Sequence, residues 1–280
     1  MTSRRRFIQT ATASTVAVAF APRFKEIGKK SANPRESADK IQLGMASYSF
    51  REFNLDDTIA MTRRLDLNRI AFKSFHLPLD SSMEEIKKVI KKVKAAGLEL
   101  YGGGVIYMKN EDEVHRAFKY AKTAGMQVII GVPEHHLLDL VEKKVKDTDI
   151  KLAIHNHGPG DKRYPGPKEA YEKIHKMDPR MGLCIDVGHT VRNGVDPADA
   201  IIKFADRLHD VHIKDVTEAT KAGATLEIGR GIVNIPDVMR ALLKIKYKGT
   251  VAFEFEKDAK DPLPGTAESL GFVKGVLSVL

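Results

Sequence analysis

From residue 41 onward, short apolar runs alternate with amphipathic stretches, and this alternation constrains the fold more than any other feature of the chain. The apolar runs predict strands that begin near Ile41, Arg69, Leu98, Met126, Ile150, Met181, Leu208 and Thr250. Between them, apolar periodicity predicts helices over 83–96, 112–124, 135–146, 167–177, 197–205 and 236–245. Strands that alternate with helices of this length form parallel βαβ units, and eight such units close into a barrel. We therefore predict a single α/β domain over residues 41–280, a (βα)8 TIM barrel.

Residues with special backbone preferences support these boundaries. Ser82 precedes one predicted helix, and Pro167 and Pro197 open two others, which is where these residue types favour helix starts. Gly97 and Gly125 stand where helices are expected to end. The fourth unit has the weakest pattern, because residues 135–146 must supply its whole helix.

A doubly wound open sheet is the structural alternative. Such a sheet carries a glycine-rich phosphate turn after its first strand, whereas this chain has Ser47-Tyr48-Ser49-Phe50 there. The run Gly102-Gly103-Gly104 follows the third strand and lacks the required spacing. The barrel is therefore the better interpretation.

Residues 1–21 have the pattern of a twin-arginine export signal. Ser3-Arg4-Arg5-Arg6-Phe7-Ile8-Gln9 resembles the export motif, and a mildly apolar run leads to Ala19-Phe20-Ala21, which resembles a cleavage site. The polar residues 22–40 predict a linker. We therefore expect a periplasmic or exported protein that passes through the twin-arginine translocase, with a disordered basic tail as the alternative.

The net charge of +9 suggests a nucleic-acid or membrane partner, but its distribution argues against both. Three charges lie at residues 4–6, and most others are lysines on helix faces, such as those at 87, 88, 91, 92 and 94. After the N-terminus no apolar run approaches the ~18 residues that a spanning helix needs. The one cysteine, Cys184, excludes an intramolecular disulfide.

Polar side chains gather where the predicted strands end, and barrels of this kind carry their chemistry at that edge. The ends of strands five to eight carry His155 and His157, Asp186 and His189, His212 and Lys214, and Glu254 and Glu256. Six of the ten histidines (76, 135, 155, 157, 189 and 212) stand at such ends, whereas His115, His175 and His209 are expected to be ordinary hydrogen-bonded residues. Imidazole and carboxylate together predict one divalent ion: Mn, Co, Zn, Ni or Fe.

Five motifs carry a resemblance to a known superfamily. They are His155-Asn156-His157-Gly158, Cys184-Ile185-Asp186-Val187-Gly188-His189, Val211-His212-Ile213-Lys214-Asp215, Gly229-Arg230-Gly231 and Phe253-Glu254. In this order they resemble the xylose isomerase-like barrels, which include sugar isomerases, epimerases, inosose dehydratases and endonuclease IV. In the epimerases, strands five to eight supply Glu, Asp, His and Glu to one metal. The resemblance therefore implies a metal held by His155, Asp186, His212 and Glu254, with Glu256 as a rival ligand.

Strand five departs from the epimerase pattern, because His155 stands where a glutamate is usual. In the epimerases two glutamates exchange a proton across the sugar, and a ligating imidazole cannot replace one of them. Glu254 remains as a base, with Lys214, His157 or His189 as proton donor. The resemblance implies a metal-stabilised enediolate on an unphosphorylated keto sugar, leading to isomerisation or epimerisation.

Two other outcomes stay open. The enediolate of a 3-keto-glycoside can instead expel a β-leaving group, which would make the protein a lyase. A non-catalytic sugar-binding barrel is the second alternative. Endonuclease IV is disfavoured, because it needs a three-zinc cluster and because export removes the protein from DNA.

Softer expectations concern substrate contacts. His76, Lys73, Glu134 and Arg230 are expected to bind substrate oxygens, each with a structural role as the alternative. Tyr48 and Phe50 are expected to form an apolar wall for the sugar ring.

Overall fold

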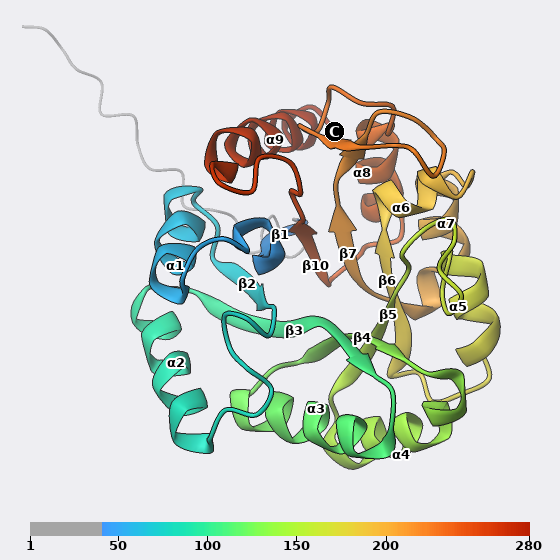
Figure 1. The fold of residues 1–280 in the computed structure, drawn as a ribbon. Helices are drawn as coiled ribbons and strands as arrows, with labels where there is room; N and C mark the ends of the chain where they lie inside the picture. Colours follow the sequence, from blue (N-terminus) through green and yellow to red (C-terminus); the bar gives the residue numbers. More distant parts are fainter. Residues whose placement is uncertain (1–40) are drawn as a thin grey trace, which may run out of the picture. The chain divides into compact units, whose positions relative to one another are not determined.

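The computed structural model describes residues 41–280, and these residues form a closed barrel of parallel strands (Figure 1). The barrel strands are β1 (Gln42–Ala46), β2 (Arg69–Phe72), β3 (Glu99–Met108), β4 (Val128–Pro133), β5 (Lys151–His155), β6 (Met181–Asp186), β7 (Leu208–Ile213) and β10 (Thr250–Phe253). Around the barrel they follow chain order, and β1 pairs with β10 to close it. The predicted (βα)8 barrel is thus confirmed, and each strand begins within two residues of its predicted start.

Helices form an outer ring around these strands (Figure 1). The ring contains α1 (Leu55–Arg64), α2 (Met83–Ala95), α3 (Glu111–Ala124), α4 (Leu138–Thr148), α5 (Pro167–Ile174), α6 (Val187–Arg192), α7 (Pro197–Lys203), α8 (Ile235–Lys244) and α9 (Pro262–Ser278). Short 3-10 helices lie at η1 (Ser47–Phe50), η2 (His135–Leu137) and η3 (Ala205–Arg207). The weak fourth unit does form, with η2 followed by α4.

Local interactions explain why the helices begin and end where they do. The Ser82 side chain accepts from the Glu85 backbone N–H, and the Glu85 carboxylate accepts from the Ser82 N–H, which is a capping box. Gly125 ends α3 at φ 66°, a left-handed conformation that glycine adopts without steric cost. These are positions at which the sequence already indicated a boundary.

The barrel strands are buried on both faces, as the strands of parallel sheets are. All six residues of β6 are buried, and so are all of β4 and β10. Because the strands hold their backbone rigidly, the residues at their C-terminal ends are fixed relative to one another. The barrel thereby determines the geometry of the site.

One buried carboxylate organises the long connection after β7. This connection contains the antiparallel pair β8 (Asp215–Val216) and β9 (Thr225–Leu226). The Asp215 side chain accepts from four backbone N–H groups, those of Val216, Gly229, Gly231 and Val233, at 2.8–3.0 Å. A single side chain therefore holds the loop together.

The predicted signal peptide (1–21) and linker (22–40) lie outside the described residues. Within residues 41–280, none of the helices combines the length and the apolar character that crossing a bilayer requires.

We predict that Asp215→Ala destabilises the protein by at least about 3 kcal/mol, because it leaves several loop N–H groups without an acceptor. Asp215→Asn keeps one side-chain oxygen and should fall between this variant and the natural protein. Urea unfolding measures both. Replacing the exposed Asp80 by alanine is the matched control, expected within about 0.5 kcal/mol of the natural protein. Equal stability of Asp215→Ala and Asp80→Ala would contradict the role given to Asp215.

Candidate metal centre

Four barrel strands bring the predicted ligands to one point. His155 ends β5, Asp186 ends β6, His212 lies in β7 and Glu254 directly follows β10. One ligand atom from each lies within 4.8 Å of the others, and all four side chains are buried. Glu254, rather than Glu256, supplies the carboxylate of this group, which we call the ligand cluster.

The distances within the ligand cluster are short. His155 Nε2 lies 3.1 Å from His212 Nδ1 and 3.5 Å from Asp186 Oδ2. Glu254 Oε2 lies 3.3 Å from His212 Nδ1 and 3.9 Å from His155 Nε2. Two ring nitrogens and two carboxylate oxygens therefore face one another in a space closed to solvent.

The donor set fits a divalent ion. Two imidazoles with two carboxylates suit zinc and the neighbouring transition metals. Among the described residues, Asp186 Oδ2 is a buried oxygen without a hydrogen bond, although it pairs electrostatically with Lys214. A buried oxygen in this state is expected where a cation completes the site.

Lys214 is a buried cation at the edge of the cluster. Its Nζ lies 2.9 Å from Asp186 Oδ2 and 2.6 Å from Glu254 Oε2, and it also contacts the Glu256 carboxylate. Burial alone would lower the pKa of Lys214, but Asp186, Glu254 and Glu256 outweigh it and raise that pKa well above its usual value. Lys214 is therefore charged at neutral pH.

The same charges keep both cluster carboxylates ionised. Burial would raise the pKa of Glu254, but Lys214 and His212 hold it well below its usual value. The pKa of Asp186 is likewise lowered against its burial, chiefly by His189 and Lys214. Both side chains are therefore available as anionic ligands.

Small and polar neighbours position Asp186 and Lys214. A Cβ added to Gly188 would lie 2.5 Å from Lys214 Cγ, so only glycine lets α6 approach this lysine. Asn156 accepts the Asp186 backbone N–H at 3.0 Å, and its amide donates to Thr190 Oγ1 at 3.2 Å. We did not single out Asn156 or Thr190 from the sequence, although Asn156 lies between two predicted site histidines.

Two further histidines stand beside the cluster. The His155 and His157 rings lie 4.6 Å apart between centroids, and His189 lies 5.9 Å from His155. Burial lowers the pKa of His157 to about 3 and that of His189 to about 4. Both rings are therefore neutral near pH 7, as proton acceptors must be.

Tyr107 is a site residue that the sequence analysis missed. Its hydroxyl lies 3.1 Å from His157 Nε2, and the two rings are stacked. Lys73 Nζ lies 5.8 Å from the centre of the Tyr107 ring and donates to the Val105 carbonyl. Tyr107 lies near the end of β3, an unusually long strand, and no pattern in the sequence marks this position as polar and functional.

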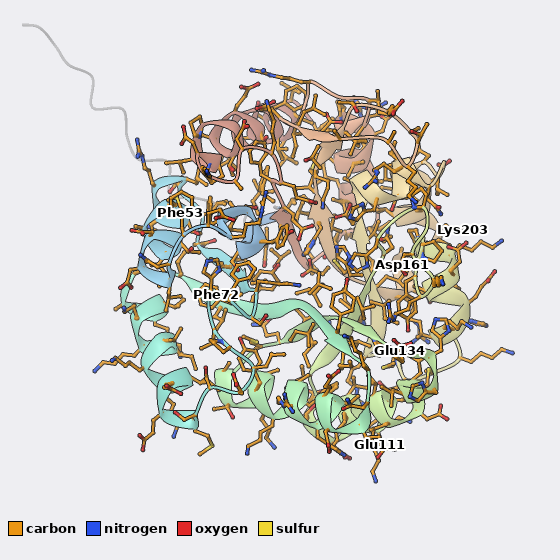
Figure 2. All side chains as sticks on the ribbon, in the orientation of Figure 1. Phe53, Phe72, Glu111, Glu134, Asp161 and Lys203 are labelled. Atoms are coloured by element: carbon orange, nitrogen blue, oxygen red, sulfur yellow. The ribbon has the colours of Figure 1, made fainter. Side chains whose placement is uncertain are left out.

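The remaining predicted contacts have structural partners. His76 is buried and lies 2.9 Å from both Thr58 Oγ1 and Ser47 Oγ. Glu134, which follows β4, accepts from Arg163 Nε at 2.6 Å. Figure 2 labels Glu134 after β4 and the buried Phe72 at the end of β2, and the two lie on different strands of the barrel.

Within residues 41–280, the Arg230 side chain pairs with the Glu227 and Glu268 carboxylates and not with the ligand cluster. Its side chain is 58% exposed and forms two hydrogen bonds with the Glu268 carboxylate, at 2.6 and 2.7 Å. This favours the surface-turn alternative for Arg230.

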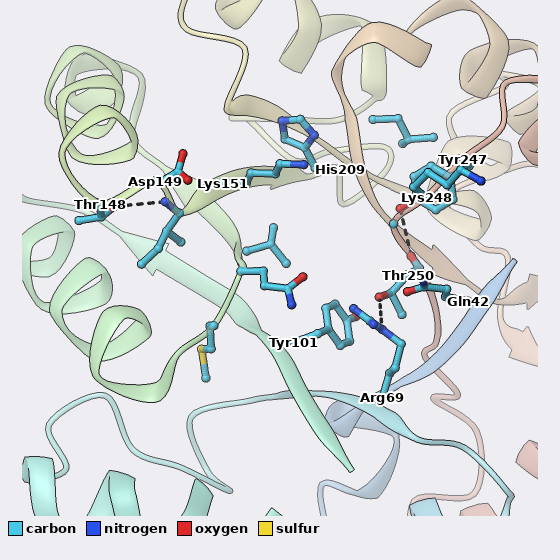
Figure 3. A pocket seen from close by; sticks show the side chains of 16 residues that line it. Gln42, Arg69, Tyr101, Thr148, Asp149, Lys151, His209, Tyr247, Lys248 and Thr250 are labelled. Carbon is cyan, nitrogen blue, oxygen red and sulfur yellow. Dashed lines mark hydrogen bonds between the residues drawn. The ribbon is translucent and has the colours of Figure 1, made fainter. Parts of the chain in front are cut away.

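A separate cavity of about 580 Å³ lies at the opposite end of the barrel (Figure 3). It is lined by residues at the beginnings of strands, including Gln42, Arg69, Lys151 and Thr250. None of the four ligand-cluster residues lines it. In these barrels the chemistry lies at the C-terminal strand ends, so we assign the site to the ligand cluster.

Comparisons with known proteins agree with the fold. An inosose dehydratase of Clostridium tetani is 30% identical over 139 residues, which cover 43% of this chain and 45% of that protein. The rhizopine catabolism protein MocC of Rhizobium meliloti is 27% identical over 154 residues, 48% of this chain and 45% of that protein. The matches thus span less than half the length of these curated relatives.

Solved structures match over nearly their whole length. An L-ribulose 3-epimerase superposes with a TM-score of 0.68 at 16% identity, over 86% of this chain and 95% of that one. A 3-keto-D-glucoside 4-epimerase from E. coli gives a TM-score of 0.67 at 15% identity, over 84% of this chain and 100% of that one. At identities this low, the structural similarity shows that the fold is shared and nothing about activity. Residues 57–276 match the family model described as the xylose isomerase-like TIM barrel, and the chain therefore belongs to that family.

Proposed function

We propose that the ligand cluster binds one divalent metal ion and that the protein is a metal-dependent enzyme acting on a keto sugar. The observation that carries this proposal is the meeting of two imidazoles and two carboxylates, from four successive strands, within 4.8 Å. Burying ionised groups is costly without a compensating partner. Lys214 compensates only part of this charge, because it is shared among three carboxylates.

When bound, such an ion supplies Lewis-acid polarisation of a ketone and of the neighbouring hydroxyl, which acidifies the carbon between them. The ionised Glu254 is placed to accept that proton. Lys214 holds Glu254 in position and contributes a fixed positive charge. Glu254, once it has taken the proton, is the group placed to return it. The neutral His157, coupled to the Tyr107 hydroxyl, and the neutral His189 are placed to relay a proton, because a neutral imidazole can accept a proton at one ring nitrogen and give one from the other.

The names of similar proteins support the substrate class. One acts on an inosose, one on L-ribulose and one on a 3-keto-D-glucoside. Each of these molecules carries a ketone beside a carbon that bears a hydroxyl. We therefore propose isomerisation or epimerisation of an unphosphorylated keto sugar or sugar derivative.

A lyase acting on 3-keto-glycosides is the second candidate, and His155 is the observation that favours it. His155 Nε2 faces His212, Asp186 and Glu254, so this ring is committed to the cluster. The epimerase pattern needs a carboxylate on each face of the sugar, and here only Glu254 of that pair is present. β-Elimination needs one base and a group that protonates the leaving oxygen. Glu254 can take the proton from carbon and then return it to the leaving oxygen, directly or relayed by the neutral His157 or His189.

We predict that the purified protein binds one Mn²⁺, Co²⁺ or Zn²⁺ per chain, measured by calorimetric titration after chelation and dialysis. Loss of a residue that only hydrogen-bonds to a metal ligand weakens metal affinity by up to about 100-fold. His212→Ala removes a ligand itself, so it should weaken the affinity by more than that. His175→Ala changes an exposed histidine and should leave the affinity unchanged. Absence of stoichiometric binding by the natural protein would overturn the metal proposal.

We predict turnover when the metal-loaded protein is incubated in D₂O with ketoses, inososes and 3-keto-glucosides. Isomerisation or epimerisation places deuterium on the carbon beside the carbonyl group of the product, whereas elimination from a 3-keto-glucoside releases the aglycone, and mass spectrometry with NMR separates these outcomes. At saturating metal, Glu254→Gln should lower kcat by about 10²–10⁴-fold. The exposed Glu172→Gln is the control and should retain full activity.

A non-catalytic sugar-binding barrel makes the opposite prediction. It requires that no sugar in the panel turns over with metal occupancy confirmed, and that Glu254→Gln leaves metal and sugar binding intact. Both results together would replace the enzyme proposal.

We also propose export through the twin-arginine translocase, on the pattern in residues 3–9. Replacing Arg4 and Arg5 by lysine should retain the full chain in the cytoplasm, whereas replacing Lys29 and Lys30 in the linker should not. Immunoblots of periplasmic and cytoplasmic fractions measure this. Equal periplasmic amounts of all three proteins would contradict the proposal.

A further inference from the structure

The two ring nitrogens of His212 face different surroundings. Nδ1 lies 3.1 Å from His155 Nε2 and 3.3 Å from Glu254 Oε2, so it is the nitrogen that belongs to the ligand cluster. Nε2 is fully buried and has no hydrogen-bond partner among the described residues. A neutral imidazole that ligates through Nδ1 carries its proton on Nε2, and that N–H needs an acceptor.

Asp210 is the carboxylate beside this nitrogen. It precedes His212 by two positions in β7, so both side chains lie on the same face of the strand. Asp210 Oδ1 lies 4.0 Å from His212 Nε2 and accepts from the Cys184 thiol at 3.8 Å. The unpartnered His212 Nε2 thus lies about one ångström beyond hydrogen-bond distance of Asp210 Oδ1, whose donor among the described residues is a weak one, the Cys184 thiol. The second oxygen of the same carboxyl group, Oδ2, is buried without a hydrogen-bond partner in residues 41–280 as well.

Leaving the His212 nitrogen and the Asp210 carboxyl group buried without a hydrogen bond between them destabilises the folded protein. Each buried polar group without a partner costs roughly 1–3 kcal/mol. A histidine that binds a metal nearly always donates its second N–H to a carboxylate, carbonyl or water, and this bond fixes the tautomer and the ring orientation. Asp210 is the carboxylate next to His212 Nε2 and can therefore be the acceptor of that N–H.

We propose that Asp210 is the positioning residue of the metal centre: it accepts the His212 Nε2–H and thereby holds Nδ1 toward the ligand cluster. This inference rests on the proposed metal site and adds a residue that lies outside the ligand cluster. Asp210 acts through His212 and contacts neither metal nor substrate. Asp210 belongs to the polar run at the end of strand seven, but sequence reasoning assigned it no role, because the ligands were sought among the residues that follow it.

The test compares Asp210→Ala, Asp210→Asn and a control. Asp210→Ala removes the acceptor and should weaken Mn²⁺ or Zn²⁺ affinity by about 10–100-fold. Asp210→Asn keeps a side-chain oxygen, and its affinity should return most of the way to that of the natural protein. Thr250→Val alters a buried polar residue of the neighbouring strand β10 that pairs with Arg69, and should leave metal affinity unchanged. Circular dichroism verifies that each variant is folded.

A second readout concerns the histidine itself. Proton NMR of ¹⁵N-histidine-labelled protein, with His212 assigned from His212→Asn, should show a slowly exchanging Nε2–H resonance in both metal-free and Zn²⁺-loaded natural protein. That resonance should be lost or shifted upfield in Asp210→Ala and recovered in Asp210→Asn.

The outcomes separate this inference from the proposed function. If the natural protein binds no metal, the metal proposal fails, while the Nε2–H resonance of the metal-free protein still tests the contact with Asp210. If the natural protein binds metal but Asp210→Ala matches it in affinity within about twofold and keeps the Nε2–H resonance, the role given to Asp210 is overturned.

Discussion

The buried ion pairs of Lys214 are the interaction on which the rest of the site depends. Asp186, Glu254 and Glu256 come from two different strand ends, and their carboxylates meet at one ammonium group. Without that cation, three negative groups beside two imidazoles would repel one another in a space largely closed to water. The Lys214 side chain packs against Gly188, where any larger residue would collide with it, so the position of the lysine depends on the glycine. The pairs also keep Lys214 protonated, which makes it a fixed positive charge beside the ligand cluster.

The barrel makes this arrangement possible because it fixes the directions of the strands before any functional side chain is considered. β5, β6, β7 and β10 are consecutive neighbours, so their C-terminal ends lie side by side. The register pairs Asp186 with His212, and β7 pairs with β10 up to Ile213 and Phe253. The loops beyond the strands carry their own supports, such as Asn156 for the turn after β6 and Asp215 for the connection after β7.

The sequence predicted most of the fold and the centre of the site, because both depend on local pattern. Strand starts were found to within two residues. Residue type and position at strand ends narrowed the ligands to a few candidates, and the resemblance to the xylose isomerase-like barrels selected the four that form the ligand cluster. It did not predict Tyr107 or Asn156, because their roles arise from contacts between strands far apart in the chain. It gave no role to Asp210, because the need for an acceptor at His212 Nε2 becomes visible only once the structure shows which ring nitrogen faces the ligand cluster. It also gave Arg230 a possible substrate contact, whereas the structure pairs that side chain with Glu268 on α9, a long-range ion pair that no local pattern reveals.

His155 determines the charge balance of the proposed centre. Two carboxylates cancel a divalent ion, and Glu256 cancels Lys214, so the centre with metal bound would be close to neutral. A glutamate at position 155, as in the epimerase pattern, would add one negative charge. The imidazole therefore favours reactions in which negative charge builds up on an initially neutral sugar, since preorganised positive groups then face that charge without an extra carboxylate opposing it. Under the proposed function, a histidine in place of a glutamate at position 155 removes one proton-transferring carboxylate. It also removes a negative charge that would oppose the charge developing on the sugar when Glu254 takes the proton.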